Sequence, residues 1–310
     1  MHRLAGGASS LTFAATDDHG EPVVVKVAPP GMMPDHHRDV LRQARVMEAL
    51  RGSPVSVPAV RWQDPGDPPD VPPLFVMGFV EGSSLEPLFD LDAAEDGGED
   101  GETVARRLTA AARTLAALHA IDPASVGLRD EPVRTMVDEV DRWSRLLATV
   151  DAALAPGWAD VADALRATAV EPMAPAIVHG DFRLGNLLAT GSAITAVIDW
   201  EIWSVGDPRV DLGWFLVNAD PETYRRPTRY AGALPPPDEL ARTYASALGR
   251  PVPDQATFAA LACFKSTATW SLIVKHNRRR TAPDPDLEAL APTLPHLLDR
   301  ARQLLSLIHI

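Results

Sequence analysis

The chain has 310 residues, of which 46% are hydrophobic, and a formal net charge of −13. This length fits one large domain or two lobes, and the acidic balance argues against a nucleic-acid partner, because phosphate backbones are bound chiefly through Lys and Arg. The single cysteine, Cys263, excludes an internal disulfide bond and fits a reducing compartment.

Signals for a membrane or for secretion are not visible in the sequence. No apolar run approaches the roughly 20 residues that a membrane helix needs, and no signal peptide is evident at Met1. We therefore expect a cytoplasmic protein with no membrane contact. The acidity would suit a cationic substrate, although part of it is local: the stretch from Asp90 to Glu102, "DLDAAEDGGEDGE", is typical of a solvated loop.

The N-terminal part of the chain predicts strands. In "RLAGGASSLTFAAT" two glycines precede an apolar run at 11–15, which indicates a turn leading into a strand, and so little chain precedes this turn that the first strand is expected to be short. "PVVVKVAPP" is a β-branched strand whose one charged residue is Lys26. Alternation places Lys26 on the face of Val24 and Ala28, so this cation needs an anionic partner.

A helix and a further strand follow. Residues 35–50 place apolar side chains at helical intervals and predict a helix. The proline-rich "QDPGDPPDVPP" predicts a loop, and "LFVMGFVEGSSL" predicts a buried strand that continues into a glycine-marked connection. Helical periodicity then dominates over 103–121, 133–150 and 159–170. His119, near the end of the first of these helices, is most simply a core or helix-terminal histidine.

The stretch 177–211, "IVHGDFRLGNLLATGSAITAVIDWEIWSVGDPRVD", carries the strongest chemical signal. Ile177 and Val178 form a short apolar run before a loop that contains Asp181 and, five positions later, Asn186. Two short strands, 187–189 and 194–198, predict a hairpin with Gly191 in the turn. The hairpin returns the chain to its start, so the carboxylates of Asp181 and Asp199 and the amide of Asn186 are expected to converge. Such a cluster is costly unless cations neutralise it.

Phosphoryl transfer needs this set of groups: a carboxylate that orients the attacking hydroxyl and accepts its proton, and an amide and a second carboxylate that hold magnesium. Asp181 fits the first role, and Asn186 and Asp199 fit the second. Asp207, Arg209 and Asp211 are expected to brace the loop and to cap a helix that begins near 212.

The C-terminal part predicts two more helices, over 239–248 and 254–275. The basic cluster "KHNRRR" at 275–280 follows them. It is either a set of cations at a helix C-terminus, which the helix dipole favours, or a binding site for an anionic part of a substrate. The final "LSLIHI" fits no predicted element. With strands early and helices late, the sequence predicts an α+β protein with two lobes.

Three motifs support a family resemblance. "HGDFRLGN", "IDWE" and "GDPRVDLGW" resemble the aminoglycoside phosphotransferase family of small-molecule kinases, which includes choline-kinase-like and acyl-CoA-dehydrogenase-associated members. His-Gly-Asp, with Trp200 and Glu201 after the metal-binding Asp, differs from the protein-kinase pattern. The resemblance implies a protein-kinase-like fold, with a nucleotide-binding lobe at 1–80 and a catalytic and substrate lobe at 81–310, and it implies ATP and Mg²⁺ as cofactors.

The resemblance also implies roles for individual residues. The catalytic group comprises Asp181, His179 and Arg183, and the metal ligands are Asn186 and Asp199. Lys26 is expected to contact the α- and β-phosphates. The remaining nucleotide contacts are the turn residues Gly6, Gly7 and Ser9 and the hinge residues Met77, Phe79 and Val80.

One position departs from the family pattern. The helix at 35–50 normally supplies a Glu that pairs with the strand lysine, and here Gln43 occupies the matching position. Asp39, one turn earlier, or Glu48 would have to supply the missing carboxylate.

The expected function is transfer of the ATP γ-phosphate to a hydroxyl of a small molecule. One alternative, motivated by Gln43 and the short first strand, is a nucleotide-binding pseudokinase module with little turnover. Another is a kinase of hydroxyacyl or CoA-linked substrates. The acidic balance favours a cationic, antibiotic-like or choline-like acceptor and "KHNRRR" favours an anionic one, and fold analogy does not decide between them.

Overall fold

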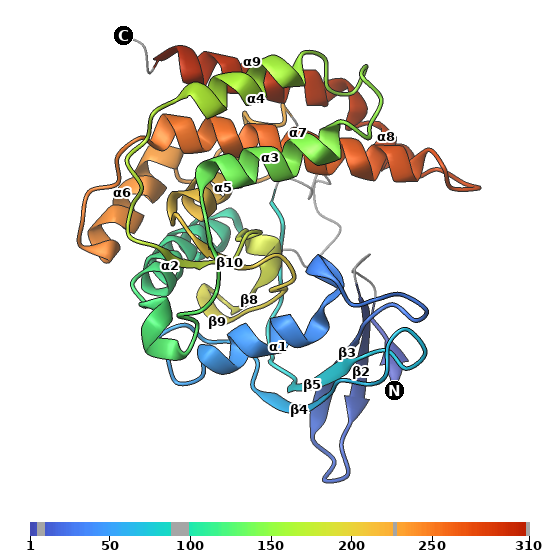
Figure 1. Ribbon diagram of the computed structural model, residues 1–310. Coiled ribbons are helices and arrows are strands. Elements are labelled where there is room, and N and C mark those ends of the chain that lie inside the picture. Colours follow the sequence, from blue (N-terminus) through green and yellow to red (C-terminus); the bar gives the residue numbers. More distant parts are fainter. Residues whose placement is uncertain (5–9, 88–98, 226–227, 308–310) are drawn as a thin grey trace.

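The computed structural model describes residues 1–4, 10–87, 99–225 and 228–307. The turn residues Gly6, Gly7 and Ser9 lie outside the described residues, as does most of the acidic stretch 90–102. The chain forms a small β-rich N-terminal lobe and a larger, mostly helical C-terminal lobe, as predicted (Figure 1).

An antiparallel sheet of five strands, in the order β1-β2-β3-β5-β4, forms the N-terminal lobe. Its strands are β1 (His2–Arg3), β2 (Leu11–Thr16), β3 (Pro22–Val27), β4 (Val60–Asp64) and β5 (Leu74–Gly78). Lys26, on the central strand β3, pairs in register with Thr12 and Phe75. The β-branched run of β3 is largely buried, and this packing fixes which way Lys26 points.

Helix α1 (Val40–Ala49) covers this sheet and begins later than the sequence predicts. Residues 36–38 form a 3₁₀ turn, and the Asp39 carboxylate caps α1 by accepting the backbone N–H of Arg42 at 3.0 Å. Asp39 therefore ends the irregular segment instead of lying within the helix. The cap also uses the carboxylate that was a candidate partner for Lys26.

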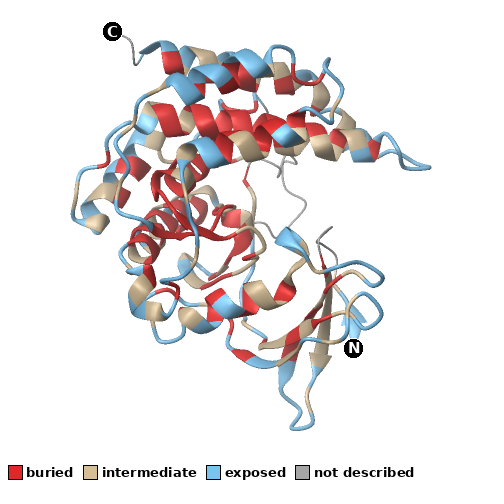
Figure 2. Ribbon diagram, viewed as in Figure 1, coloured by how far each residue is buried: buried red, intermediate tan, exposed pale blue. Residues whose placement is uncertain are grey.

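The C-terminal lobe is built around one long helix, α7 (Gln255–Asn277), against which α3, α5 and α9 pack. Figure 2 shows that the buried residues of this lobe gather along α7, α5 and α2. The other helices of this lobe are α2 (Gly101–His119), α3 (Met136–Leu147), α4 (Trp158–Ala167), α5 (Arg209–Ala219), α6 (Pro237–Leu248), α8 (Pro285–Glu288) and α9 (Leu294–Ser306).

Among the described residues, α7 is the one helix long and apolar enough to cross a membrane. Its most apolar window is 72% buried inside the protein. The neighbouring helices supply the apolar surroundings that this sequence needs, so α7 is the core helix of the lobe.

Two small sheets hold the predicted catalytic stretch. The hairpin of β8 (Leu187–Thr190) and β9 (Ala193–Val197) confirms the predicted pair of strands. A second sheet has the order β6-β10-β7, with β6 (Val133–Arg134), β7 (Ala176–Val178) and β10 (Ser204–Gly206). β10 runs antiparallel to β7 and parallel to β6.

Besides the start of α1, three predictions about where elements lie were wrong. The helix expected over 133–150 begins at Met136, because 133–134 pair with β10. The helix expected near 212 begins at Arg209. The closing "LSLIHI" was assigned to no element, but Leu305 and Ser306 belong to α9. Leu305 is buried in the hydrophobic cluster that contains the apolar residues of α7.

Candidate active site

The loop after β7 is held by a buried carboxylate. Asp211, in the first turn of α5, accepts the backbone N–H of His179 at 2.6 Å and that of Gly180 at 2.8 Å. Burial alone would raise the pKa of Asp211, but the hydrogen bonds that it accepts from the His119 ring and from the backbone N–H of His179 keep that pKa below the usual value. A charged Asp211 therefore anchors the loop, and its bracing role follows the prediction.

Gly180 needs its missing side chain. Its φ is +86°, and a Cβ atom there would lie 2.6 Å from the carbonyl oxygen of Ile202. The left-handed backbone turns the chain sharply between β7 and Asp181. The same close approach places the segment that follows Asp199 directly against the loop.

His179 stands behind the loop and is fully buried. Its Nε2 donates to the carbonyl oxygen of Ile198 at 2.9 Å, and its Nδ1 accepts the backbone N–H of Asp181 at 3.1 Å. Its ring lies 4.5 Å from the Trp200 ring, measured between centroids. His179, one of the predicted catalytic residues, therefore lies behind the loop and helps to orient it.

Asp181 is the exposed end of this arrangement, with a side chain 24% accessible. Its Oδ1 accepts the indole N–H of Trp214 at 2.8 Å, and its Oδ2 accepts the amide N–H of Asn186 at 2.8 Å. Arg183 lies beside both oxygens at 3.3 and 3.4 Å and also contacts Glu86 at 3.0 Å. Burial opposes the charge of Arg183, but the carboxylates of Asp181 and Glu86 raise its pKa above the ordinary value. Asp181 is thus held in one orientation by three donors.

The predicted metal ligands, Asn186 and Asp199, line the same pocket. Asn186 donates its amide N–H to Asp181, and its Oδ1 accepts no hydrogen bond within the described chain. Asp199 has a left-handed backbone, with φ +64°, which is uncommon for a residue other than glycine and recurs at functional sites. Burial would raise the pKa of Asp199, but the ion pair with Lys26, at 2.9 Å, lowers it. Asp199 is therefore a carboxylate at neutral pH.

Lys26 has the anionic partner that its apolar face requires, and that partner is Asp199. Gln43 Oε1 accepts a second hydrogen bond from Lys26 at 3.0 Å, while its buried Nε2 has no partner in the described chain. Gln43 is thus the residue beside the lysine. The candidates to replace the expected Glu do not take that place: Asp39 caps α1, and Glu48 is exposed on it.

A pocket of about 390 Å³ lies between the sheet and the hairpin. The predicted hinge residues Met77, Phe79 and Val80 line it together with Lys26 and Asn186. Its polar end also includes Asp199, and its apolar walls come from both lobes through Val24, Leu188 and Ile198. An apolar slot that ends in a lysine, an amide and a carboxylate suits a flat ring attached to a phosphate chain.

Three residues of this site were missed in the sequence. Trp214 is the last residue of the motif "GDPRVDLGW" but was given no role, and Glu86 gives no signal of its own, because a glutamate in a loop is common. Lys265 did give one, since it is a lone lysine on the apolar stripe of α7, the same pattern that singled out Lys26. Its Nζ donates to the Gly180 carbonyl and lies 3.8 Å from the centre of the Trp214 ring.

The fold is that of the protein-kinase-like phosphotransferases, and comparison with known proteins supports that class. A model of the phosphotransferase enzyme family matches residues 1–261. The chain belongs to this family.

Two relatives illustrate the similarity in sequence. Acyl-CoA dehydrogenase family member 10 of Mus musculus is 25% identical over 248 residues, 76% of this chain and 22% of that protein. Acyl-CoA dehydrogenase family member 11 of Gallus gallus is 29% identical over 223 residues, 69% of this chain and 27% of that protein. The chain spans about a quarter of the length of these relatives.

The structural matches cover nearly the whole chain. A Ralstonia eutropha JMP134 protein assigned as an aminoglycoside phosphotransferase has a TM-score of 0.78 at 23% identity, covering 98% of this chain and 92% of that one. A thermostable mutant of aminoglycoside phosphotransferase APH(4)-Ia, in a ternary complex with AMP-PNP and hygromycin B, has a TM-score of 0.62 at 16% identity, covering 96% and 92%. At these identities the matches establish the fold.

Proposed function

We propose that this chain is an ATP-dependent phosphotransferase that moves the γ-phosphate to a hydroxyl group of a small molecule. The observation that carries the proposal is Asp181, a partly exposed carboxylate held by Trp214, Asn186 and Arg183. A carboxylate fixed in one orientation is what positioning of an attacking hydroxyl requires.

The pocket between the lobes is the proposed nucleotide site. It draws residues from both sides of the proposed lobe boundary between residues 80 and 81, and Lys26 at its polar end would contact the α- and β-phosphates. A structural relative was solved in complex with AMP-PNP, an ATP analogue, and this supports ATP as the donor. We expect the cytoplasm, where ATP is plentiful, to be the site of action.

The donor set also fits a divalent cation. Asn186 Oδ1 and the Asp199 oxygen turned away from Lys26 are the oxygen ligands that Mg²⁺ prefers. Asn186 and Asp199 would hold the ion, whose positive charge, when bound, neutralises phosphate oxygens.

The proposed reaction forms one bond, breaks one bond and releases one proton, which Asp181 accepts. The acceptor oxygen forms a bond to the γ-phosphorus, the bond from that phosphorus to the β–γ bridging oxygen breaks, and ADP leaves. Asp181 orients the hydroxyl and accepts its proton. Arg183, shared between Asp181 and Glu86, places positive charge beside the transferring group.

The pseudokinase alternative rested on the short first strand, which is the two-residue β1, and on Gln43. Its side-chain oxygen still binds Lys26, and Asp199 supplies the negative charge, so the loss of the Glu does not leave the lysine unpaired. This geometry favours an enzyme.

The test is an acceptor screen with purified protein, MgATP, and panels of cationic, neutral and anionic hydroxyl compounds. The expected result is ADP formation that depends on an acceptor, with one phosphate gained by that acceptor. Tight MgATP binding without transfer to any acceptor would support the pseudokinase instead.

A further inference from the structure

A second pocket, of about 570 Å³, opens between the N-terminal end of α1 and helix α3. The two helices belong to different lobes (Figure 1). Four arginines and two glutamates carry the charge of its lining: Arg42, Arg134, Arg142, Arg145, Glu131 and Glu201. The local excess of positive charge is the reverse of the −13 of the whole chain.

The topology places this pocket at the same sheet edge as the catalytic loop. Ser204 of β10 pairs with Val178, the last residue of β7, and Val205 pairs with Val133, the first residue of β6. The loop after β7, the segment before β10 and the segment before β6 therefore leave the sheet together. Neighbouring strands lie about 4.8 Å apart, so β6 and β7, two strands apart, are separated by about 10 Å.

Contacts join the pocket to Gly180, the residue before Asp181. Ile202, which lines the pocket, packs against Gly180. On the other side, Lys265 donates to the Gly180 carbonyl and lies 5.4 Å from the centre of the Trp143 ring. The Arg142 guanidinium lies 4.7 Å from the centre of the same ring. A small molecule in this pocket would reach toward the catalytic loop.

Carboxylates only partly balance the arginines. Glu131 is shared between Arg42 at 3.2 Å and Arg45 at 2.6 Å. Glu139 lies 3.7 Å from Arg134 and 3.9 Å from Arg142, and its other oxygen accepts the indole N–H of Trp143.

Arg142 is the most enclosed of the pocket arginines that donate no hydrogen bond to a carboxylate in the described chain. Its side chain is 25% exposed, and the closest carboxylate oxygen with which it pairs lies at 3.9 Å, beyond hydrogen-bond distance. Burial lowers its pKa, the carboxylates of Glu139 and Glu201 oppose that shift without offsetting it, and the positive charges of Arg134 and Arg42 add to it. A partly desolvated guanidinium without a close partner is costly, and an anion bound between these arginines would relieve the cost.

We propose that this pocket, the basic pocket, binds an anionic group of the acceptor, a carboxylate or a phosphate, while the acceptor hydroxyl meets Asp181. The inference rests on the proposed phosphotransferase function and names the chemical class of its acceptor. It assigns the anion to Arg142 and Arg134 and not to the "KHNRRR" cluster. In that cluster Arg278 pairs with Glu288, and Lys275 donates to the carbonyl of Thr149.

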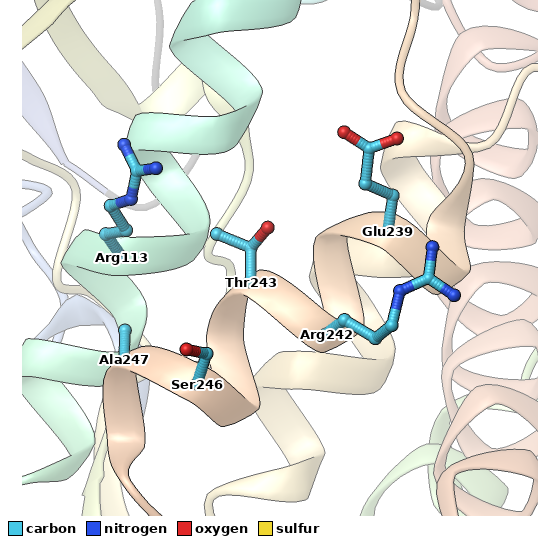
Figure 3. A pocket seen from close by; sticks show the side chains of 6 residues that line it. All are labelled: Arg113, Glu239, Arg242, Thr243, Ser246 and Ala247. Atoms are coloured by element: carbon cyan, nitrogen blue, oxygen red, sulfur yellow. The ribbon is translucent and has the colours of Figure 1, made fainter.

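A second charged hollow offers a matched control. Figure 3 shows Arg113 on α2 and Arg242 on α6, the latter near Glu239 on the same helix. These side chains are exposed and belong to a different face of the C-terminal lobe. Arg242→Gln therefore removes an arginine without touching the basic pocket.

The activity test compares matched acceptors. Short hydroxy carboxylic acids are each assayed beside their methylamides, and sugar phosphates beside the free sugars, so that the two arms separate carboxylate from phosphate. We expect the anionic member of a pair to have the higher kcat/KM, and Arg142→Gln to reduce that preference about tenfold or more, the loss typical of a charge-assisted hydrogen bond. Arg142→Lys, which keeps the charge, and Arg242→Gln should preserve most of the preference, and KM for ATP should not change.

The contrary outcomes are separable. Efficient transfer to neutral or aminoglycoside acceptors, with a preference that Arg142→Gln does not alter, would overturn the basic-pocket assignment and leave phosphotransfer standing. MgATP binding without transfer to any acceptor would contradict the proposed function.

A binding measurement decides the anion site in either case. Inorganic phosphate is titrated at constant ionic strength into protein saturated with Mg²⁺ and AMP-PNP, and the melting temperature is followed. A stabilisation that is lost in Arg142→Gln and kept in Arg242→Gln supports the site. Equal stabilisation of all three proteins by phosphate would overturn it, and so would the absence of any stabilisation of the wild type.

Discussion

At the scale of single residues, Lys26 shows how one cation is shared. Asp199 binds it at 2.9 Å and Gln43 at 3.0 Å, so the neutral amide takes part of the role that a glutamate has elsewhere in the family. Position 43 therefore matters for orienting the lysine more than for charge.

Gln43→Ala removes this acceptor. A hydrogen bond to a charged group contributes about 1.5–3 kcal/mol, so we expect KM for ATP to rise about tenfold while kcat changes less. Gln43→Glu, which restores an acceptor at the same place, should keep KM near the wild-type value. Steady-state kinetics with varied MgATP checks this, and an unchanged KM in Gln43→Ala would show that Asp199 alone positions Lys26.

Lys265 makes stability depend on pH. Burial lowers its pKa to about 8, with Asp181 and other carboxylates opposing that shift. Below about pH 8 both the folded and the unfolded states are protonated, and the full cost of the buried charge is present. Between about pH 8 and the ordinary value of 10.5 the unfolded state binds more protons, so stability rises with pH.

Urea unfolding of the wild type and of Lys265→Met measures this effect. From about pH 7.5 to about pH 9.5 the free energy of unfolding of the wild type should rise by about 2 kcal/mol relative to the variant. Parallel curves over this range would mean that Lys265 keeps an ordinary pKa.

At the scale of elements, α5 and α7 touch backbone to backbone. A Cβ on Gly213 of α5 would lie 2.4 Å from the carbonyl oxygen of Phe258 in α7. Because α5 carries Asp211 and Trp214, this close contact sets the position of two groups that hold the catalytic loop.

Gly213→Ala should destabilise the protein by about 1–3 kcal/mol through overpacking, even though alanine favours a helix by up to about 1 kcal/mol. Thermal unfolding followed by circular dichroism measures the loss. Gly232→Ala, where a Cβ would meet nothing within 4 Å, is the control. A Gly213→Ala variant as stable as the wild type would contradict the close packing.

The element scale also shows what the sequence can predict. The hairpin 187–197 and the helices α2, α6 and α7 follow from local periodicity and turn residues, so they were found. The strand at 133–134 was missed because its pairing with β10 joins residues some 70 positions apart, and a two-residue strand has no period of its own. Trp214 and Lys265 reach Asp181 and Gly180 through tertiary packing, so the sequence marks these two residues without showing what they contact.

At the scale of the whole molecule, the proposed nucleotide site exists only when the lobes meet, since its walls come from the N-terminal sheet and from β8. A ligand that binds only the folded state at about 100 times its Kd stabilises it by about 2.7 kcal/mol. MgAMP-PNP should therefore raise the melting temperature of the wild type, and Lys26→Met should lose most of that shift. An equal shift in both proteins would place the nucleotide elsewhere.

The most direct test of phosphoryl transfer at Asp181 is a single-turnover measurement with the best acceptor from the screen, comparing the wild type with Asp181→Asn. The amide keeps the shape of the carboxylate but cannot accept the proton. We predict that transfer slows by at least ~10²-fold, while MgATP affinity and melting temperature stay near the wild-type values. Transfer at an unchanged rate in Asp181→Asn would contradict the proposed role of this residue.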